Sequence, residues 1–106
     1  MQFRGGMNEL MRQAARMQRK IEETKQRIKD NEVEGAAGGD KVKVTVTCEG
    51  KLKRISIDPE LLKSEEIDMT LDMVVAAANN ALEAADKQVE AEINKITGGV
   101  KIPGLG

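Results

Sequence analysis

The chain has 106 residues, of which 33% are charged, and its net charge is −1. This size and composition predict one small domain spanning residues 1–106. It has no His and a single Cys, so we expect no disulfide, no metal centre, no cofactor and no catalytic Ser–His or Cys–His pair. Neither a signal peptide nor an apolar stretch long enough to cross a bilayer is visible, so the expectation is a cytoplasmic protein with no membrane contact and no small-molecule substrate.

The first predicted element is a basic helix over residues 7–31, capped by Asn8 and preceded by a flexible lead, residues 1–6. Its apolar positions recur three and four residues apart, a pattern typical of a helix that packs on another helix: Met7, Leu10, Ala14, Met17, Ile21, Thr24 and Ile28. Such a helix is roughly 37 Å long, which is more than a small chain can cover with its own core. We therefore expect a homodimer with Leu10, Met17 and Ile21 in its interface.

Three strands are predicted next, over residues 32–37, 40–48 and 51–58. The second strand alternates strictly between apolar and polar residues, as a half-buried strand does. Two-residue turns at Gly38-Gly39 and Glu49-Gly50 would connect the strands into an antiparallel meander of order 1-2-3. These turns predict the following opposed pairs: Val33 with Val44, Gly35 with Val42, Val42 with Ile57, Val44 with Ile55, and Val46 with Lys53.

Asp58-Pro59 predicts one helical turn, and Ser64 would cap a second long helix over residues 64–97 that ends at Gly98-Gly99, before a tail over residues 98–106. One apolar stripe follows this helix: Ile67, Leu71, Val74, Ala78, Leu82, Ala85, Val89, Ile93 and Ile96. We place Leu82, Val89 and Ile93 in the dimer interface. Whether the two helical stripes pair within a chain or between chains stays open. The predicted fold class is α+β, with the order α-β-β-β-α and two long helices.

Charge is distributed unevenly, since residues 1–29 carry +5, residues 30–58 carry −1 and residues 59–106 carry −5. A basic segment of this kind favours an acidic partner such as DNA. With no Trp or Tyr there is no stacking platform for single strands, and no short recognition helix is predicted, which leaves phosphate contacts with duplex DNA. The candidate DNA-binding residues are Arg4, Arg12, Arg16, Arg19, Lys20 and Arg27.

Several short motifs, in this order, resemble the YbaB/EbfC family of bacterial nucleoid-associated proteins. They are Phe3-Arg4-Gly5-Gly6-Met7, Leu10-Met11-Arg12-Gln13-Ala14, Met17-Gln18, Val33-Glu34-Gly35, Val42-Lys43-Val44-Thr45-Val46, Ile57-Asp58-Pro59-Glu60-Leu61-Leu62, the segment 71–81 and the segment 98–104. The resemblance implies an α-β-β-β-α homodimer whose long helices project like the arms of tweezers. It also implies that the protein binds duplex DNA, alters its conformation, lies in the nucleoid, and takes part in nucleoid organisation and gene regulation.

Two alternatives remain beside this reading. A dimeric adaptor could use the same coiled arms to bind another protein without touching DNA. An enzyme would require a polar pocket that nothing in the sequence predicts.

Overall fold

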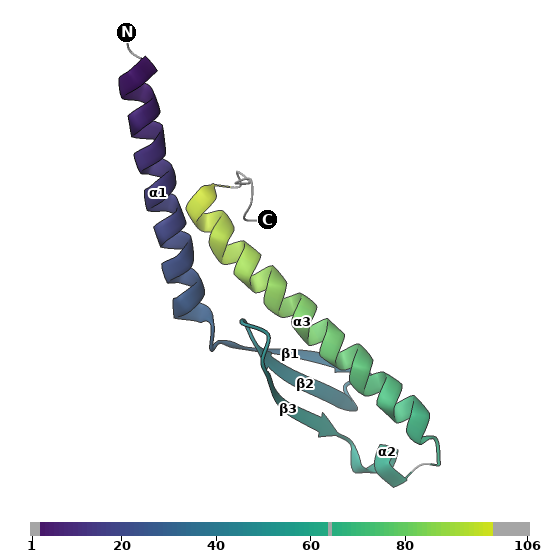
Figure 1. Cartoon of the computed structure of the whole chain (residues 1–106). Coiled ribbons are helices and arrows are strands. Elements are labelled where there is room, and N and C mark those ends of the chain that lie inside the picture. The colour runs from purple at the N-terminus through teal and green to yellow at the C-terminus, as the bar shows by residue number, and fades with distance from the viewer. Residues whose placement is uncertain (1–2, 64, 99–106) are drawn as a thin grey trace.

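The computed structural model describes residues 3–63 and 65–98 and shows three helices and one sheet (Figure 1). The elements follow the order α1 (Phe3–Ile28), β1 (Glu32–Ala37), β2 (Val42–Thr47), β3 (Leu52–Ile57), α2 (Pro59–Lys63) and α3 (Ile67–Thr97). The strands form one antiparallel sheet of order β1-β2-β3. The predicted α+β fold, with its meander between two long helices, is confirmed.

Helix α1 begins at Phe3, four residues before the predicted start at Met7. Gly5-Gly6 therefore lies inside the helix, and Asn8 is an interior residue instead of a cap. A helical Gly costs only about 1 kcal/mol relative to Ala, so two of them do not prevent an extra turn. The helix ends at Ile28, three residues earlier than predicted, because the carbonyls of Lys29 and Asn31 accept hydrogen bonds from the β2–β3 turn (N···O 3.2 and 3.0 Å).

The β1–β2 hairpin differs from the prediction by two residues. Gly38, Gly39 and Asp40 all have positive φ values of 62–70°, and residues 38–41 form a four-residue turn in place of the predicted Gly38-Gly39 turn. Val33 therefore lies opposite Val46, and Gly35 lies opposite Val44. Because side chains alternate with a period of two, a shift of two residues leaves each side chain on the face that the pattern assigned to it.

The β2–β3 hairpin follows the predicted register for Val42–Ile57 and Val44–Ile55. The third predicted pair is wrong, since Val46 lies opposite Leu52 and not Lys53. A bulge between Thr45 and Val46 causes this change, because one extra residue of β3 is accommodated there. The turn is closed by Thr47, whose hydroxyl oxygen accepts a hydrogen bond from the Lys51 backbone N–H at 3.1 Å.

Helix α2 is capped as predicted, since the backbone N–H of Glu60 donates to Oδ1 of Asp58 at 3.0 Å. The predicted cap Ser64 lies outside the described residues, and α3 begins at Ile67 after Glu66. At the other end, Gly98 adopts a left-handed conformation (φ 64°) and donates to the carbonyl of Asn94 at 2.8 Å. The predicted Gly98 stop is thus confirmed, whereas the tail beyond it lies outside the described residues.

Alanines form the buried face of α3, and Ala85 is the one member of the predicted stripe that is fully buried. Ala77, Ala81 and Ala85 lie against the fully buried side of β2, formed by Val42, Val44 and Val46. Burying a valine in this way contributes about 1.5–3 kcal/mol relative to leaving it exposed. The predicted stripe residues Ile67, Leu71 and Leu82 remain exposed: they lie beside the contact and not in it.

Gly35 of β1 explains why this face is lined with alanine. A Cβ built on Gly35 would collide with the backbone of α3, at 2.5 Å from the carbonyl oxygen of Ala77 and 2.7 Å from Cα of Ala81. The strand and the helix therefore approach closely only because both present small residues. On the same flank, the amide of Asn80 donates to the carbonyl of Ala36 at 3.0 Å, which locates this side of α3 over β1.

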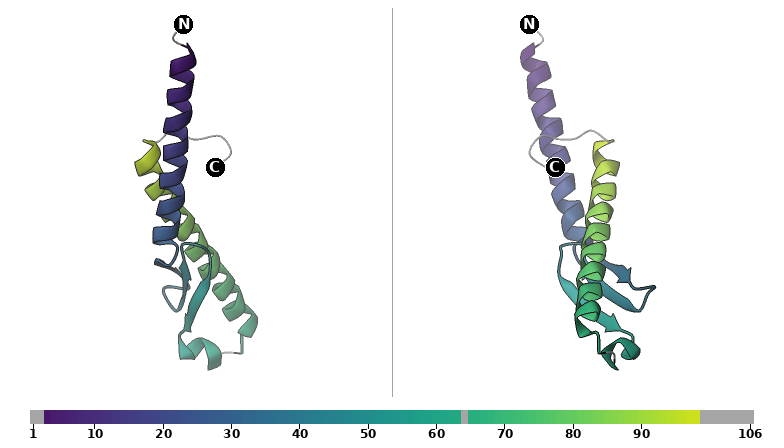
Figure 2. Two further views of the ribbon diagram at one scale, coloured as in Figure 1. Left: turned by 60° about the vertical axis from the view of Figure 1, so that its left-hand side comes forward. Right: turned by 90° about the vertical axis from the view of Figure 1, so that its right-hand side faces the viewer.

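Helices α1 and α3 contact each other near the base of α1, within one chain. Ile21, Thr24 and Ile28 of α1 are buried there, and the ion pair Arg27–Glu92 (3.8 Å) connects the two helices. The open question is therefore answered for this part of the stripe, which pairs within the chain. The remainder of α1 projects beyond the end of α3 (Figure 2) and gives the molecule extents of 76 × 20 × 16 Å.

Among the described residues, no helix is both long enough and apolar enough to cross a membrane.

Candidate nucleic-acid interface

Three arginines of α1 form a stripe on the side that faces away from α3. Arg12, Arg16 and Arg19 are spaced by four and three residues, so they lie along one face of the helix. The buried positions Ile21 and Ile28 lie on the opposite face. All three arginines are exposed. The stripe is therefore free to meet a partner along the projecting half of α1 (Figure 1).

Two of these arginines form ion pairs with Glu9, at 3.7 Å for Arg12 and 3.5 Å for Arg16. All three side chains are more than half exposed, and surface pairs of this kind contribute about 0–1 kcal/mol. A phosphate group can replace such a partner at little cost. Within residues 3–63 and 65–98, Arg19 forms no ion pair at all.

The other candidates are placed differently. Lys20 is exposed and forms no ion pair with any described residue. Arg27 lies outside the stripe and pairs with Glu92 of α3 at 3.8 Å, although its side chain is 67% exposed. Arg4 belongs to α1, but its side chain lies outside what the structure describes.

The residues assigned to a dimer interface fall into three groups: exposed, half-buried and buried. Leu10 is 63% exposed near the tip of α1, and Leu82 is 38% exposed on α3. Met17, Val89 and Ile93 are half-buried. Ile21 is only 1% exposed in the single chain, because it packs at the junction of α1 and α3. In this conformation the Ile21 side chain therefore has no surface left to contact a second subunit.

Sequence reasoning missed an uncovered apolar surface beside α3. This helix lies over β1 and β2, which leaves the inner side of β3 open. Ile55, opposite the buried Val44, is 46% exposed, and Leu52, opposite Val46, is 57% exposed. The flank of α3 opposite Asn80 adds Leu71, Val75 and Leu82, all exposed. The alternation of Ile55 and Ile57 in β3 could have found part of this surface, whereas Leu52 joins the same side only through the bulge.

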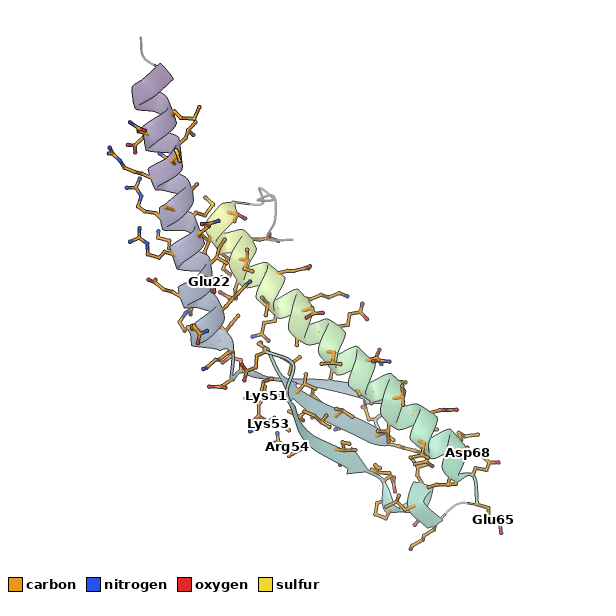
Figure 3. The ribbon with its side chains drawn as sticks, viewed as in Figure 1. Glu22, Lys51, Lys53, Arg54, Glu65 and Asp68 are labelled. Atoms are coloured by element: carbon orange, nitrogen blue, oxygen red, sulfur yellow. The ribbon has the colours of Figure 1, made fainter. Side chains whose placement is uncertain are left out.

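A basic cluster at the start of β3 was also missed. The run Lys51-Leu52-Lys53-Arg54 places three cations within four residues. Figure 3 shows Lys51, Lys53 and Arg54 on the side of the sheet that faces away from α3. The run is visible in the sequence, but the net charge of −1 over residues 30–58 gave no reason to single it out.

No constellation for chemistry is found in the described part of the chain. It contains no group of three or more His, Cys, Asp or Glu residues placed to hold a metal ion. Cys48 is buried, and this burial raises the pKa of its thiol above the ordinary value. The thiol therefore stays protonated at neutral pH and is a poor nucleophile, as expected for a residue that fills space at the end of a strand.

Comparisons with known proteins agree with this geometry. A profile of the YbaB/EbfC DNA-binding family matches residues 3–100. A nucleoid-associated protein of Acetivibrio thermocellus is 44% identical over 104 residues, covering 97% of this chain and 92% of the relative. A nucleoid-associated protein of Afipia carboxidovorans is 43% identical over 97 residues, covering 92% of each chain.

A solved structure shares the fold. It is the crystal structure of an uncharacterized protein from Helicobacter pylori, which superposes with a TM-score of 0.61 at 20% sequence identity and covers 74% of this chain and 90% of that one. The matched family is named for DNA binding and not for a reaction, in agreement with the expectation that the chain is not an enzyme. With a match over nearly its whole length, the chain belongs to the YbaB/EbfC DNA-binding family.

Proposed function

We propose that this protein is a nucleoid-associated protein that binds duplex DNA mainly through phosphate contacts and alters its conformation. Its place in the cell would be the nucleoid within the cytoplasm, with roles in nucleoid organisation and gene regulation. The observation that carries the proposal is the stripe of Arg12, Arg16 and Arg19, which is exposed, faces away from α3, and lies on a projecting helix. The family and the names of the relatives support the same ligand.

Binding of this kind should depend strongly on salt. Two chains present six arginines of the stripe, and each phosphate neutralised on B-DNA contributes about −0.9 to the slope of log K against log salt. We expect a slope of about −5 or steeper for the native protein, measured by fluorescence anisotropy with a mixed-sequence duplex between about 50 and 200 mM salt. Competition with a second, unrelated duplex should reveal little sequence preference. A slope near zero would contradict the proposal.

We also propose that the protein acts as a homodimer. The uncovered apolar surface formed by Leu52, Ile55, Leu71, Val75 and Leu82 supports this, because a contiguous exposed apolar patch usually marks an interaction site. A second copy of the chain carries the same patch, so a two-fold axis could cover both patches at once. The dimer would then present two basic arms to one duplex.

A charged residue in the middle of this surface should separate the dimer. We expect Ile55→Glu to give a monomer at a concentration where the native chain sediments as a dimer, because a carboxylate would be buried without a partner. Ser56→Glu is the matched control, since the adjacent residue of β3 lies on the opposite face of the sheet and is exposed. Equal dimer dissociation constants for the two variants, by analytical ultracentrifugation, would exclude this surface as the interface.

The competing function is a dimeric adaptor whose arms bind another protein. The exposed apolar residues near the tip of α1, Met7, Leu10 and Met11, favour it, because DNA phosphates offer them no apolar partner. Charge reversal on α1 distinguishes the two functions, as described below.

A further inference from the structure

The charges of the molecule restrict the side from which DNA can approach. Helix α3 carries six acidic residues against Lys87 and Lys95, and so repels a polyanion along its length. The basic stripe of α1 lies on the side away from α3. The open face of the sheet, defined here as the face not covered by α3, also lies on that side. A duplex bound to α1 therefore meets the open face of the sheet without passing α3.

The cations of this open face differ in how strongly they are held. Lys51 pairs with Glu49 at 3.2 Å, and Arg54 pairs with Glu32 at 2.6 Å. Lys53 is exposed and Lys43 is half-buried, and neither forms an ion pair with any residue in 3–63 or 65–98. Lys53 and Lys43 are thus the free positive charges of the sheet.

A backbone contact joins this face to the end of α1. The N–H groups of Cys48 and Glu49, in the β2–β3 turn, donate to the carbonyls of Asn31 and Lys29 at 3.0 and 3.2 Å. The first residues of β3 therefore follow directly beside the α1–β1 junction. Basic residues continue from α1 onto the sheet without an intervening acidic helix, and Figure 3 shows Lys51, Lys53 and Arg54 projecting away from α3.

The open face also contains a shallow hollow of about 330 Å³. It is lined by polar side chains that suit a phosphate oxygen, namely Lys43, Thr45, Arg54 and Ser56. The carboxylate of Glu34 lines it as well and opposes an anion. The Arg54–Glu32 pair, at 2.6 Å, is closer than the pairs of Arg12 and Arg16 with Glu9, and Glu34 is acidic. The attraction of this face for phosphate therefore depends mainly on Lys53 and Lys43.

We propose that the open face of the sheet is a second phosphate-binding surface, centred on Lys53 and Lys43, so that one duplex runs from α1 across the sheet. This inference rests on the proposed binding of duplex DNA and extends the contact beyond the arms. The apolar side of β3, with Leu52 and Ile55, points the other way, so a dimer formed there leaves the second surface accessible.

Lysine acetylation with mass spectrometry tests the proposal on the unaltered protein. The probe is a mixed-sequence duplex longer than the 76 Å extent of the protein, about 25 base pairs. We expect the duplex to slow labelling of Lys53 and Lys43 together with Lys20, while Lys87 and Lys95 of α3 react as they do without DNA. Protection of Lys20 with unchanged labelling of Lys53 would overturn the second surface and leave DNA binding by α1 intact. If no lysine is protected, the proposed function itself fails.

A matched pair of variants gives an independent measurement. Lys53→Glu should weaken duplex binding roughly tenfold at low salt and reduce the magnitude of the salt slope by about two for a dimer, since each chain loses one phosphate contact. Lys87→Glu changes the net charge equally on α3, where it is also exposed, and should change affinity far less. Equal losses in the two variants would refute the proposal. Lys53→Gln, which removes the charge without adding another, should show a smaller loss with the same change of slope.

Discussion

Gly35→Ala should lower the midpoint of thermal unfolding by roughly 15 °C or more. The added Cβ would meet the backbone of Ala77 and Ala81, and a helix backbone cannot move aside as the end of a flexible side chain can. Either α3 lifts off the sheet or β1 shifts, and overpacking of this kind costs about 3 kcal/mol or more. In a domain of this size, each kcal/mol of lost stability lowers the midpoint of thermal unfolding by about 4–8 °C. The measurement is a thermal melt followed by circular dichroism at a fixed protein concentration.

Gly6→Ala is the control for this substitution. No atom lies within 4 Å of the position that its Cβ would occupy, and Gly6 is inside α1, so alanine should stabilise the helix by about 0.5–1 kcal/mol. A double variant tests whether side chain or backbone causes the clash. Combining Gly35→Ala with Ala81→Gly should not restore stability, because the clashing atoms of Ala81 belong to its backbone. Native-like melting of Gly35→Ala would show that the strand and the helix are not in close contact.

Reversing three charges on α1, in the variant Arg12→Glu, Arg16→Glu, Arg19→Glu, should reduce duplex binding on the order of 10³-fold at low salt. In a dimer the change replaces six cations by six anions on the surface that the proposal places against phosphate. The residues are exposed and lie on the side of α1 away from α3, so the fold should persist. Fluorescence anisotropy measures the affinity, and sedimentation velocity verifies that the dimer remains.

The chain offers a control with the same change of charge. Lys63→Glu, Lys87→Glu, Lys95→Glu alters three exposed lysines of α2 and α3 and leaves α1 unchanged. We expect this variant to lose much less affinity, because α3 already repels DNA and does not touch it. Similar losses in both variants would mean that binding responds to net charge alone and not to a defined surface. If native protein binds no duplex but retains a protein ligand that the reversal abolishes, the adaptor function is the correct one.

Much of the sheet follows from local sequence. The alternation of Val42, Val44 and Val46 correctly predicted the buried side of β2, because the two-residue period of a strand does not depend on the rest of the fold. The turn at residues 38–41 was harder to predict, because three consecutive residues adopt positive φ there, and two glycines are compatible with several turn lengths. The bulge near Thr45 left no sequence signal that we could identify.

The helices show where sequence reasoning stops. Large apolar residues such as Leu71 and Leu82 suggested the buried face of α3, since hydrophobic area usually drives burial. The structure instead buries Ala77 and Ala81, beside Ala85 of the predicted stripe, because the close approach of Gly35 requires small residues at Ala77 and Ala81. The signal in the sequence was a glycine in one element facing alanines at four-residue spacing in another, and only the tertiary structure reveals that they meet.

The sequence by itself determined the number, kind and order of the elements, the family, and the segregation of positive charge toward the first helix. These properties arise from periodicity, turn residues and charge along the chain, all of which are local. Only the tertiary structure decided that Ile21 is buried within its own chain, that the inner side of β3 remains uncovered, and that Lys53 lies on the side of the sheet away from α3. Those facts depend on the angle and depth at which α3 packs on the sheet, which are set by contacts between residues more than forty positions apart.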